Sequence, residues 1–280
     1  MEAIFYSKIS DLLGLIKAKR PLVHHITNYV TANDCANIVL AIGASPIMAD
    51  DMEEVEDIVS LASALVLNMG TLNKRTVEAM LAAGKKANEL GIPVILDPVG
   101  AGATTFRSKT AERIVNEIKL AVIRGNMSEI KSISGLGSTT KGVDASEQDI
   151  AQSEDLKYGK SIAENLSSRL NCVTAITGAT DIVSKGGKTL FIDNGHKMLS
   201  AVTGTGCMCT SLIGACCAVT KDYFTAVAAG ILTMGISGEK AYEKLISSDN
   251  GSGIFRVKLI DSVFQLTGKD LEERGKVREG

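Results

Sequence analysis

The chain has no strong excess of charge of either sign and no long apolar run. Its formal net charge is −2 over 280 residues, and its Lys and Arg residues are scattered, which disfavours a surface built to bind nucleic acid or an anionic membrane. The most apolar stretch, Ala226–Ile236, is interrupted by Gly230 and Gly235 and is too short to cross a bilayer. The N-terminus carries Glu2 and lacks the basic start of a signal peptide. We therefore expect a cytoplasmic protein whose partners are small molecules, with no nucleic acid and no membrane.

Paired cysteines and two common nucleotide-binding motifs are also missing. None of the six cysteines forms a Cys-x-x-Cys pair, so a zinc site is not expected, and most of these thiols would be small buried groups, Cys207 excepted. No Gly-x-x-x-x-Gly-Lys-Ser/Thr sequence is present, which excludes a P-loop enzyme. The segment Gly100–Thr105 begins like a dinucleotide-binding fingerprint. Because Thr105 stands where the third Gly or Ala belongs, a Rossmann oxidoreductase is disfavoured.

Short apolar runs alternate with helical patterns along most of the chain, which is typical of a sheet covered by helices on both faces. The length and the 45% apolar content suit one domain over residues 1–280, and the alternation predicts an α/β fold with a mostly parallel central sheet. Strands are expected at Leu22–Ile26, Pro46–Met48, Leu65–Asn68, Val94–Asp97, Ala121–Arg124 and Val173–Thr177. Helices are expected at Asn33–Ile42, Glu53–Ala62, Lys74–Leu90, Lys109–Ile118, Met127–Ile133 and Leu156–Leu170.

Later segments depart from this alternation. Asp181–Lys185 and Thr189–Asp193, joined by a Gly-Gly-Lys turn, predict a late β-hairpin, and beyond Cys207 the pattern is almost wholly helical. Gly135–Asp155 is rich in Gly, Ser, Thr, Asp and Gln and is longer than most loops in a compact domain. It is either a flap that closes over a ligand or a surface insertion, and composition does not decide between the two.

The segment Ala201–Cys207 turns a glycine-opened bend into an apolar helix that runs to about Val219. The first N–H groups of a helix lack intrahelical partners and carry partial positive charge, and Gly204 and Gly206 let an anion approach the backbone. Such a turn is typical of a phosphate-binding site, where Cys207 would meet a substrate hydroxyl. The alternative is an ordinary strand-to-helix turn with a buried thiol.

Polar side chains follow three of the expected strands, at the edge of a parallel sheet where ligands bind. They are Asp97, Arg124, Glu129 and Thr177. Carboxylates suit Mg²⁺ together with water and phosphates, and arginine suits the remaining phosphate charge, so the set favours a magnesium–polyphosphate ligand. Taken singly, Asp97 and Asn126 could cap helices, Glu129 could interact with a helix dipole, and Arg124 could form a surface ion pair.

Five blocks of sequence, taken together and in order, resemble the hydroxyethylthiazole kinases of thiamine salvage. The blocks are Pro21–Asn28, Gly43–Ala49, Asp97–Ala103, Arg124–Asn126 and Val202–Cys207. The resemblance covers nearly the whole chain and implies a ribokinase-like fold, ATP and Mg²⁺ as cofactors, and phosphorylation of the hydroxyl of 4-methyl-5-(2-hydroxyethyl)thiazole. It also implies a homotrimer with active sites between subunits.

The resemblance further implies roles for individual residues. The substrate-binding positions are Met48, Gly204, Asn28, Val30 and Gly70. The ATP-binding positions are Arg124 and Thr177, and the acidic positions near magnesium are Asp97 and Glu129. Cys207 is the catalytic position, which the wider ribokinase-like superfamily usually fills with aspartate.

Residue type alone leaves the chemistry of Met48 and Cys207 open. Met48 can contact a sulfur-bearing ring and Asn28 can supply a hydrogen bond, but without the resemblance Met48 is better interpreted as a core side chain. A thiol is mostly protonated at neutral pH, although a helix start can lower its pKa. Since phosphoryl transfer needs little early proton removal, Cys207 is expected to help catalysis without being indispensable.

Three other functions remain compatible with the sequence. A non-catalytic nucleotide or thiazole sensor would keep the pocket without forming ADP, and an oxidoreductase would need a nicotinamide. A kinase of the same fold could also act on a hydroxymethylpyrimidine or a sugar. Met48 and its small neighbours argue against a sugar, which requires several polar partners.

Overall fold

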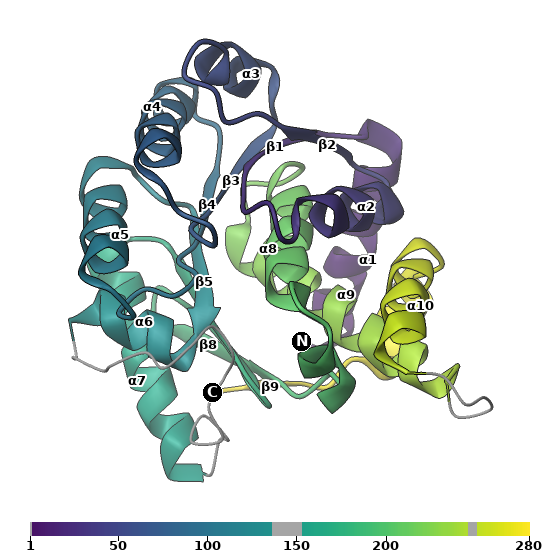
Figure 1. Ribbon diagram of the computed structural model, residues 1–280. Coiled ribbons are helices and arrows are strands. Elements are labelled where there is room, and N and C mark those ends of the chain that lie inside the picture. The colour runs from purple at the N-terminus through teal and green to yellow at the C-terminus, as the bar shows by residue number, and fades with distance from the viewer. Residues whose placement is uncertain (1, 136–152, 246–250) are drawn as a thin grey trace.

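A single nine-stranded sheet forms the centre of the computed structural model, which describes residues 2–135, 153–245 and 251–280 (Figure 1). The strands are β1 Leu22–Ile26, β2 Ser45–Met48, β3 Ala64–Asn68, β4 Val94–Asp97, β5 Val122–Asn126, β6 Val173–Thr177, β7 Asp181–Lys185, β8 Lys188–Ile192 and β9 Val277–Glu279. Their order is β2-β1-β3-β4-β5-β6-β7-β8-β9. The pairs from β2 to β6 are parallel and those from β6 to β9 are antiparallel, so the carboxyl ends of β1 to β6 share one edge.

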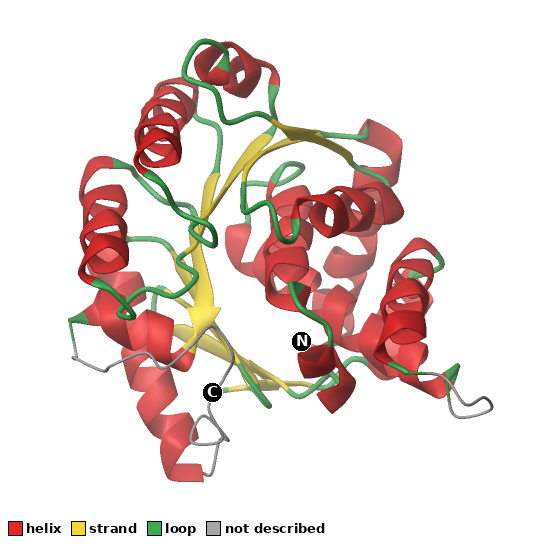
Figure 2. Ribbon diagram, in the orientation of Figure 1, coloured by secondary structure: helices red, strands yellow, loops and turns green. Residues whose placement is uncertain are grey.

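Helices cover both faces of this sheet (Figure 2). On one face lie α1 Glu2–Lys19, α2 Ala32–Ile42, α8 Thr205–Cys217, α9 Tyr223–Glu243, α10 Ser252–Phe264 and α11 Gly268–Arg274. On the other lie α3 Val55–Leu61, α4 Lys74–Leu90, α5 Thr105–Glu117, α6 Met127–Ser134 and α7 Ser153–Leu170. A short 3₁₀ helix, η2 Lys197–Ala201, leads into the turn before α8.

The two layers have separate hydrophobic cores. Met208, Leu212 and Ile231 belong to the core on the α8 side, whereas Met80 and Ile114 belong to the core on the α4 side. Every residue of β3 and of β4 is buried, as expected of parallel strands that are covered on both faces. Polar groups can therefore reach solvent only where these strands end, and this places the chemistry at the sheet edge.

The predicted α/β fold with a mostly parallel sheet is confirmed. The bounds of β1, β4, β6 and α4 agree with the sequence prediction, and the late hairpin is present as β7 and β8. The second hairpin strand begins at Lys188, because the turn consists of Gly186 and Gly187 alone, both with positive φ. The helical last third also contains the short strand β9, which pairs with β8. Helix α1 was not predicted from the sequence.

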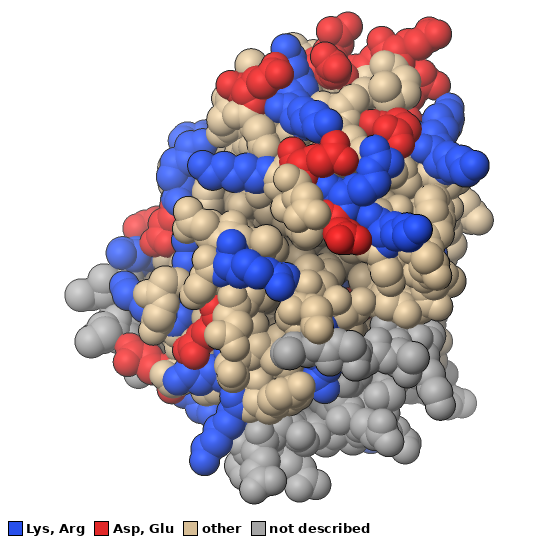
Figure 3. All heavy atoms as spheres, turned by 90° about the vertical axis from the view of Figure 1, so that its left-hand side faces the viewer, with Lys and Arg blue, Asp and Glu red and all other residues tan. Residues whose placement is uncertain are grey.

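The surface over α3 to α7 carries interspersed charges (Figure 3). Arg113 pairs with Glu78 at 2.8 Å, and Lys85 pairs with Glu117 at 2.6 Å, so positive and negative groups compensate one another locally. In the described parts of the chain, no helix combines the length and apolar character that a membrane crossing needs. The predicted flap or insertion falls mainly on residues 136–152, which lie outside the described residues.

Candidate active site

Side chains from several strand ends and from the start of α8 converge at the carboxyl edge of the sheet. Asn68 and Asp97 are direct neighbours at the ends of β3 and β4, and Asn126 and Thr177 are neighbours at the ends of β5 and β6. The α8 helix starts against the same edge, and its Cys207 accepts a hydrogen bond from Asn68 Nδ2 at 3.2 Å. Residues that were predicted from the sequence as site residues, such as Asp97, Thr177 and Cys207, thus lie at the same edge of the sheet.

Asp97 is the most buried acid of this cluster. Its side chain is 0% exposed, and its Oδ2 accepts hydrogen bonds from Asn68 Nδ2 at 2.8 Å and from Thr210 Oγ1 at 2.9 Å. Burial raises the pKa of Asp97, while Arg124 and these two donors oppose the rise. Its Oδ1 has no hydrogen-bond partner among the described residues and lies 3.8 Å from Arg124 Nη1. One buried carboxylate oxygen is therefore available to a further ligand.

Arg124 brings a second positive group to the start of α8. Its guanidinium donates to Thr177 Oγ1, and its Nε has no partner among the described residues. Burial acts to lower the pKa of Arg124, but Asp97 and the other acidic groups around it together outweigh burial and the pKa is raised, so the side chain is charged. A Cβ at Gly206 would lie 2.8 Å from Arg124 Nη1, which shows how closely this arginine approaches the helix start. A helix N-terminus and a guanidinium in contact repel each other unless an anion lies between them.

Glu129 forms a capping box at the start of α6. Its Oε2 accepts from Asn126 N at 2.9 Å, and Asn126 Oδ1 accepts from Glu129 N at 2.9 Å. Glu129 Oε1 accepts from Gly100 N at 2.9 Å, which ties α6 to the loop after β4. Burial, with help from the charge of Asp97, raises the pKa of Glu129 to about 7. Asn126 therefore caps α6, and Glu129 lies in its first turn, as the structural alternatives for these two residues expected.

Cys207 lies in the first turn of α8 and is partly exposed. Burial raises its pKa to about 11, and Asp97 adds to the rise, while Asn68 and Thr31 act in the opposite direction. The lowering of this pKa that a helix start can produce is thus outweighed, because desolvation of the thiolate is the larger effect. At neutral pH the group is a thiol.

Two of the five expected substrate residues, Asn28 and Gly70, pack against each other, and a third, Gly204, packs against Thr31. A Cβ at Gly70 would lie 2.5 Å from Asn28 Cβ, and a Cβ at Gly204 would lie 2.4 Å from Thr31 Cγ2. Asn28 Nδ2 in turn lies 3.5 Å from Cys207 Sγ. These contacts need both glycines. They place Asn28, Gly70 and Gly204 around the thiol.

The other two expected substrate residues lie at the rim of the same edge. Val30, two residues after Asn28, is 57% exposed, and Met48, at the end of the edge strand β2, is 36% exposed. Met48 is thus not a core side chain. An exposed methionine at a strand end supports contact with a ligand or a partner more than a packing role.

Several polar residues of the site were not singled out from the sequence. Asn68 was detectable, because it ends a predicted strand as Asp97 does. Arg107 of α5 donates to the carbonyls of Met69, Gly70 and Val99, joining the loops after β3 and β4. Arg107, unlike Asn68, could not have been found from the sequence. The loops that contain its partners come together only in the folded protein.

Asp181 is a further buried acid of this region. Its Oδ1 accepts from Gly178 N at 2.9 Å and so fixes the loop that follows Thr177. Burial raises the pKa of Asp181 to about 7, while Arg124 acts to lower it. This acid begins β7, and no motif in the sequence marks it.

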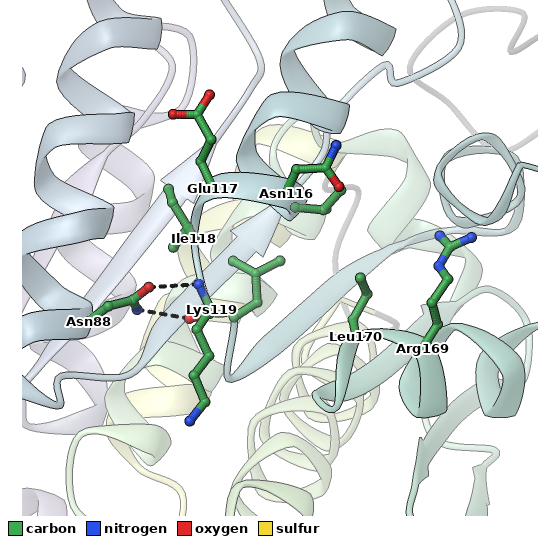
Figure 4. A pocket seen from close by; sticks show the side chains of 9 residues that line it. Asn88, Asn116, Glu117, Ile118, Lys119, Arg169 and Leu170 are labelled. Carbon is green, nitrogen blue, oxygen red and sulfur yellow. Dashed lines mark hydrogen bonds between the residues drawn. The ribbon is translucent and has the colours of Figure 1, made fainter.

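A separate hollow lies at the opposite end of the sheet (Figure 4). Its volume is about 420 Å³, and its lining includes Asn88, Lys119 and Arg169. Asn88 holds the backbone of Lys119 through two hydrogen bonds of 2.9 and 2.6 Å. Because it flanks the start of β5, this hollow is remote from the strand ends that carry the candidate site.

The chain is similar to known proteins over nearly its whole length. A family model described as the hydroxyethylthiazole kinase family matches residues 13–269. A hydroxyethylthiazole kinase from Clostridium beijerinckii is 58% identical over 97% of this chain and 97% of its own. The solved structure of a hydroxyethylthiazole kinase protein from Pyrococcus horikoshii is 39% identical, with a TM-score of 0.87 over 98% of this chain and 99% of its own.

More distant structures share the fold alone. A pyridoxal kinase from Staphylococcus aureus in complex with AMP-PCP is 15% identical, with a TM-score of 0.59 over 78% of this chain and 87% of its own. A ribokinase-like superfamily protein from Enterococcus faecalis is 11% identical, with a TM-score of 0.57 over 89% of this chain and 90% of its own. The fold is therefore ribokinase-like, and the chain belongs to the hydroxyethylthiazole kinase family.

Proposed function

We propose that this chain transfers the γ-phosphoryl group of ATP to the hydroxyl of 4-methyl-5-(2-hydroxyethyl)thiazole. The observation that carries the proposal is the convergence of Arg124, the start of α8 and Asp97 at one sheet edge. The two positive elements suit the phosphates, and Asp97 suits a divalent cation between them. Membership of a kinase family supports the same reaction.

The chemistry follows from alignment and charge neutralisation. The alcohol oxygen bonds to the γ-phosphorus, the bond to the β,γ-bridging oxygen breaks, and ADP leaves with that electron pair. Cys207 is a thiol at neutral pH, so it orients the alcohol, and the hydroxyl proton passes late to a phosphoryl oxygen or to water. Arg124 and Thr177 hold the nucleotide phosphates, and the backbone at Gly204 approaches the reacting group without a Cβ in the way.

The residues at the edge fit Mg²⁺. Asp97 Oδ1 is a buried oxygen without a partner among the described residues, and Glu129 retains lone pairs beyond its two backbone N–H bonds. The described residues contain no cluster of three or more His, Cys, Asp or Glu able to hold a metal, which suits an ion held mainly by water and phosphates. Mg²⁺ held by Asp97, with Glu129 reaching it through water, would neutralise phosphate charge.

The thiazole would lie between the buried amide of Asn28 and the exposed side chains at the rim. Asn28 offers a directional hydrogen-bonding group, whereas Met48 and Val30 offer apolar contact. Gly70 and Gly204 leave room beside the thiol of Cys207. A flat, weakly polar ring suits this mixture better than a sugar, which requires several polar partners.

The proposed assembly is a homotrimer with active sites between subunits. Tyr29 is 82% exposed, Val30 57% and Met52 47%, and all three follow strands that end at the site. Apolar side chains gathered beside a binding site are typical of a surface that a partner covers. The six free cysteines suit a reducing compartment, and we propose the cytoplasm as the location.

A substrate panel with ATP, read out as ADP formation, tests the function. We expect ADP with the thiazole alcohol and Mg²⁺, and loss of that activity when EDTA removes the metal. A hydroxymethylpyrimidine and a sugar serve as competing substrates. ADP formed with either of them in preference to the thiazole would contradict the proposal, as would binding of the thiazole without ADP.

A further inference from the structure

Asn68, at the end of β3, joins three parts of the candidate site through one side chain. It is 2% exposed. Its Nδ2 donates to Asp97 Oδ2 at 2.8 Å and to Cys207 Sγ at 3.2 Å. Its Oδ1 accepts from Asn28 Nδ2 at 2.9 Å and from Gly70 N at 2.9 Å. Both amide hydrogens and both oxygen lone pairs are used.

The orientation of this amide follows from its partners. The Gly70 N–H can only donate, so the oxygen of Asn68 must face it. The NH₂ group therefore faces Asp97 and Cys207, both of which can accept. Replacing that NH₂ by a carboxylate oxygen would leave at most one donor for the two contacts, because a carboxyl group this close to Asp97 shares a single proton with it.

The contact with Asp97 fixes which carboxylate oxygen remains available. Asn68 Nδ2 and Thr210 Oγ1 both bind Oδ2, so Oδ1 is the oxygen left beside Arg124 Nη1 at 3.8 Å. Without the Asn68 donor, the carboxylate loses one of the two groups that set its rotation. The proposed magnesium ligand would then no longer be held in one orientation.

The contact with Cys207 fixes the sulfur in the same way. Asn68 and Asn28 each direct an amide N–H at Sγ, at 3.2 and 3.5 Å. Asn28 is itself held, since its Oδ1 accepts from Thr31 N and from Thr31 Oγ1, both at 3.0 Å. A continuous hydrogen-bonded chain thus runs from Thr31 through both amides to Asp97.

We propose that Asn68 is a positioning residue for phosphoryl transfer, which holds the Asp97 carboxylate and the Cys207 thiol in a fixed relation around the acceptor hydroxyl. This inference rests on the proposed function. Every partner of Asn68 belongs to the candidate site, whereas other asparagines of the chain, such as Asn73 and Asn88, cap a helix or hold a backbone segment. Its role is therefore tied to the reaction geometry.

The first test compares Asn68→Asp with Asn88→Asp. The two changes are chemically identical, and each removes an N–H donor, but the donor of Asn88 is exposed and bonds the backbone of Lys119 before β5, at the far end of the sheet (Figure 4). We expect kcat of Asn68→Asp to fall at least about 100-fold, as for small misplacements of reacting groups, with the KM for ATP and thiazole changed by less than about threefold. Asn88→Asp should keep wild-type kinetics. A kcat within threefold of wild type in Asn68→Asp would overturn the inference.

A second measurement reads the position of the thiol without using the kinase reaction. The other five cysteines are buried, so iodoacetamide should modify Cys207 selectively, which peptide mass spectrometry can verify. The hydrogen bond from Asn68 lowers the pKa of Cys207, so its loss in Asn68→Asp disfavours the thiolate, and we expect alkylation of Cys207 at pH 8 to slow at least about tenfold, with Asn88→Asp unchanged. An unchanged rate would refute the contact whatever substrate the enzyme uses. A wild-type enzyme that ignores the thiazole would instead refute the proposed function.

A double-variant cycle keeps the test informative if Asn68→Asp folds poorly. Asn68→Ala introduces no charge, and its folding is checked by thermal melting. If Asn68 acts partly through the thiol, Asn68→Ala should reduce kcat less in a Cys207→Ala background than in the wild type. If the two substitutions instead reduce kcat independently, so that their fold-losses multiply, and the loss follows the loss of thermal stability, Asn68 has a merely structural role. That result would count against the inference.

Discussion

At the scale of single residues, burial decides the protonation state of the groups that meet at the sheet edge. Cys207 has its pKa raised to about 11, and Glu129 has its pKa raised to about 7, mainly because each is removed from water. A neutral thiol cannot serve as a strong base. The site therefore depends on holding charges and the alcohol in place, and variants of these groups should differ sharply in effect.

Replacing Cys207 should be tolerated better than replacing Glu129. We expect Cys207→Ala to keep measurable kinase activity, with kcat reduced by about tenfold to 100-fold, because the thiol orients the alcohol and does not act as a strong base. Cys207→Asp should match or exceed wild type, because a carboxylate is ionised at neutral pH and the amides of Asn68 and Asn28 can donate to it. Glu129→Gln should lose at least about 1,000-fold, since it removes charge beside the proposed metal and one capping acceptor.

Steady-state kinetics on these three variants, with ATP binding measured by calorimetry, decide the ranking. An inert Cys207→Ala enzyme that binds ATP normally would show that the thiol is indispensable. Glu129→Gln activity close to wild type would show that the cap alone is the role of this acid.

Asp181 should make the protein less stable as the pH rises from about 4 to 7. Its pKa is raised from 3.8 to about 7 in the folded state, so the folded protein holds a proton that the unfolded chain has already released. The stability from this group is full below the unfolded value and is lost as the pH rises through the folded value. Asp181→Asn keeps the oxygen that accepts from Gly178 N and should flatten this pH dependence, by on the order of 1 to 4 kcal/mol.

Urea unfolding at pH 4.5 and pH 7.5 measures this effect. Asp193 provides the control, because its hydrogen bond with Arg278 lowers its pKa, so it stays ionised at both pH values and Asp193→Asn should leave the stability difference between them unchanged. Stability from Asp193 is present at higher pH and is lost as the pH falls through its folded value. Identical pH profiles for the wild type and Asp181→Asn would show that the buried acid does not control stability.

The sequence could locate those site residues that end strands. Asp97, Arg124 and Thr177 were predicted from this rule, and Asn68 satisfies it as well. Thr210 could not be found in this way, because it reaches Asp97 from a helix 113 positions later in the chain. Contacts of that kind depend on how α8 crosses the sheet, which no local pattern encodes.

At the scale of elements, periodicity predicted most strands and helices to within a few residues. The exceptions have particular causes. Helix α1 has a readable apolar spacing at Ile9, Leu12, Leu13 and Ile16, all buried, so its signal was present. Strand β9 has three residues and forms only because β8 offers it an edge, so its cause is tertiary.

Adding a single methyl group at the start of α8, by Gly204→Ala, should destabilise the protein strongly. Gly204 and Gly135 have similar backbone conformations, with φ of 84° and 80°, but an added Cβ collides with Thr31 at Gly204 and meets none of the described residues within 4 Å at Gly135. Gly135→Ala should cost about 1 to 2 kcal/mol for its backbone strain alone. Gly204→Ala should cost a further ~1 to 3 kcal/mol for the clash, and should raise the KM for the thiazole.

Chemical denaturation and steady-state kinetics compare these two variants. Thr31→Ser provides a rescue, since serine keeps the hydroxyl that bonds Asn28 but lacks the Cγ2 that an added Cβ would strike. The Gly204→Ala, Thr31→Ser double variant should regain part of the lost stability. Equal losses for Gly204→Ala and Gly135→Ala would mean that the close approach to Thr31 has no energetic weight.

At the scale of the whole molecule, the two ends of the parallel strands carry different kinds of side chain. The amino-terminal end of the strands holds the hollow near Asn88, whose hydrogen bonds fix only a backbone segment. The carboxyl end holds buried acids, Arg124 and the start of α8. Apolar side chains are exposed beside this second end, at Tyr29 and Val30. The proposed active site and the proposed trimer contact therefore concern the same edge of the sheet.

Introducing charge beside the site should separate the proposed trimer and weaken substrate binding together. Val30 is 57% exposed at the rim, and a buried carboxylate in an apolar contact is costly, so Val30→Glu should convert trimers into monomers and raise the KM for the thiazole about tenfold. Leu90→Glu places the same charge on a residue that is 48% exposed at the other end of the sheet and should change neither property. Light scattering after size exclusion gives the mass, and kinetics give the KM. A Val30→Glu trimer with a raised KM would show that Val30 contacts substrate alone, whereas a monomeric wild type would rule out sites shared between subunits.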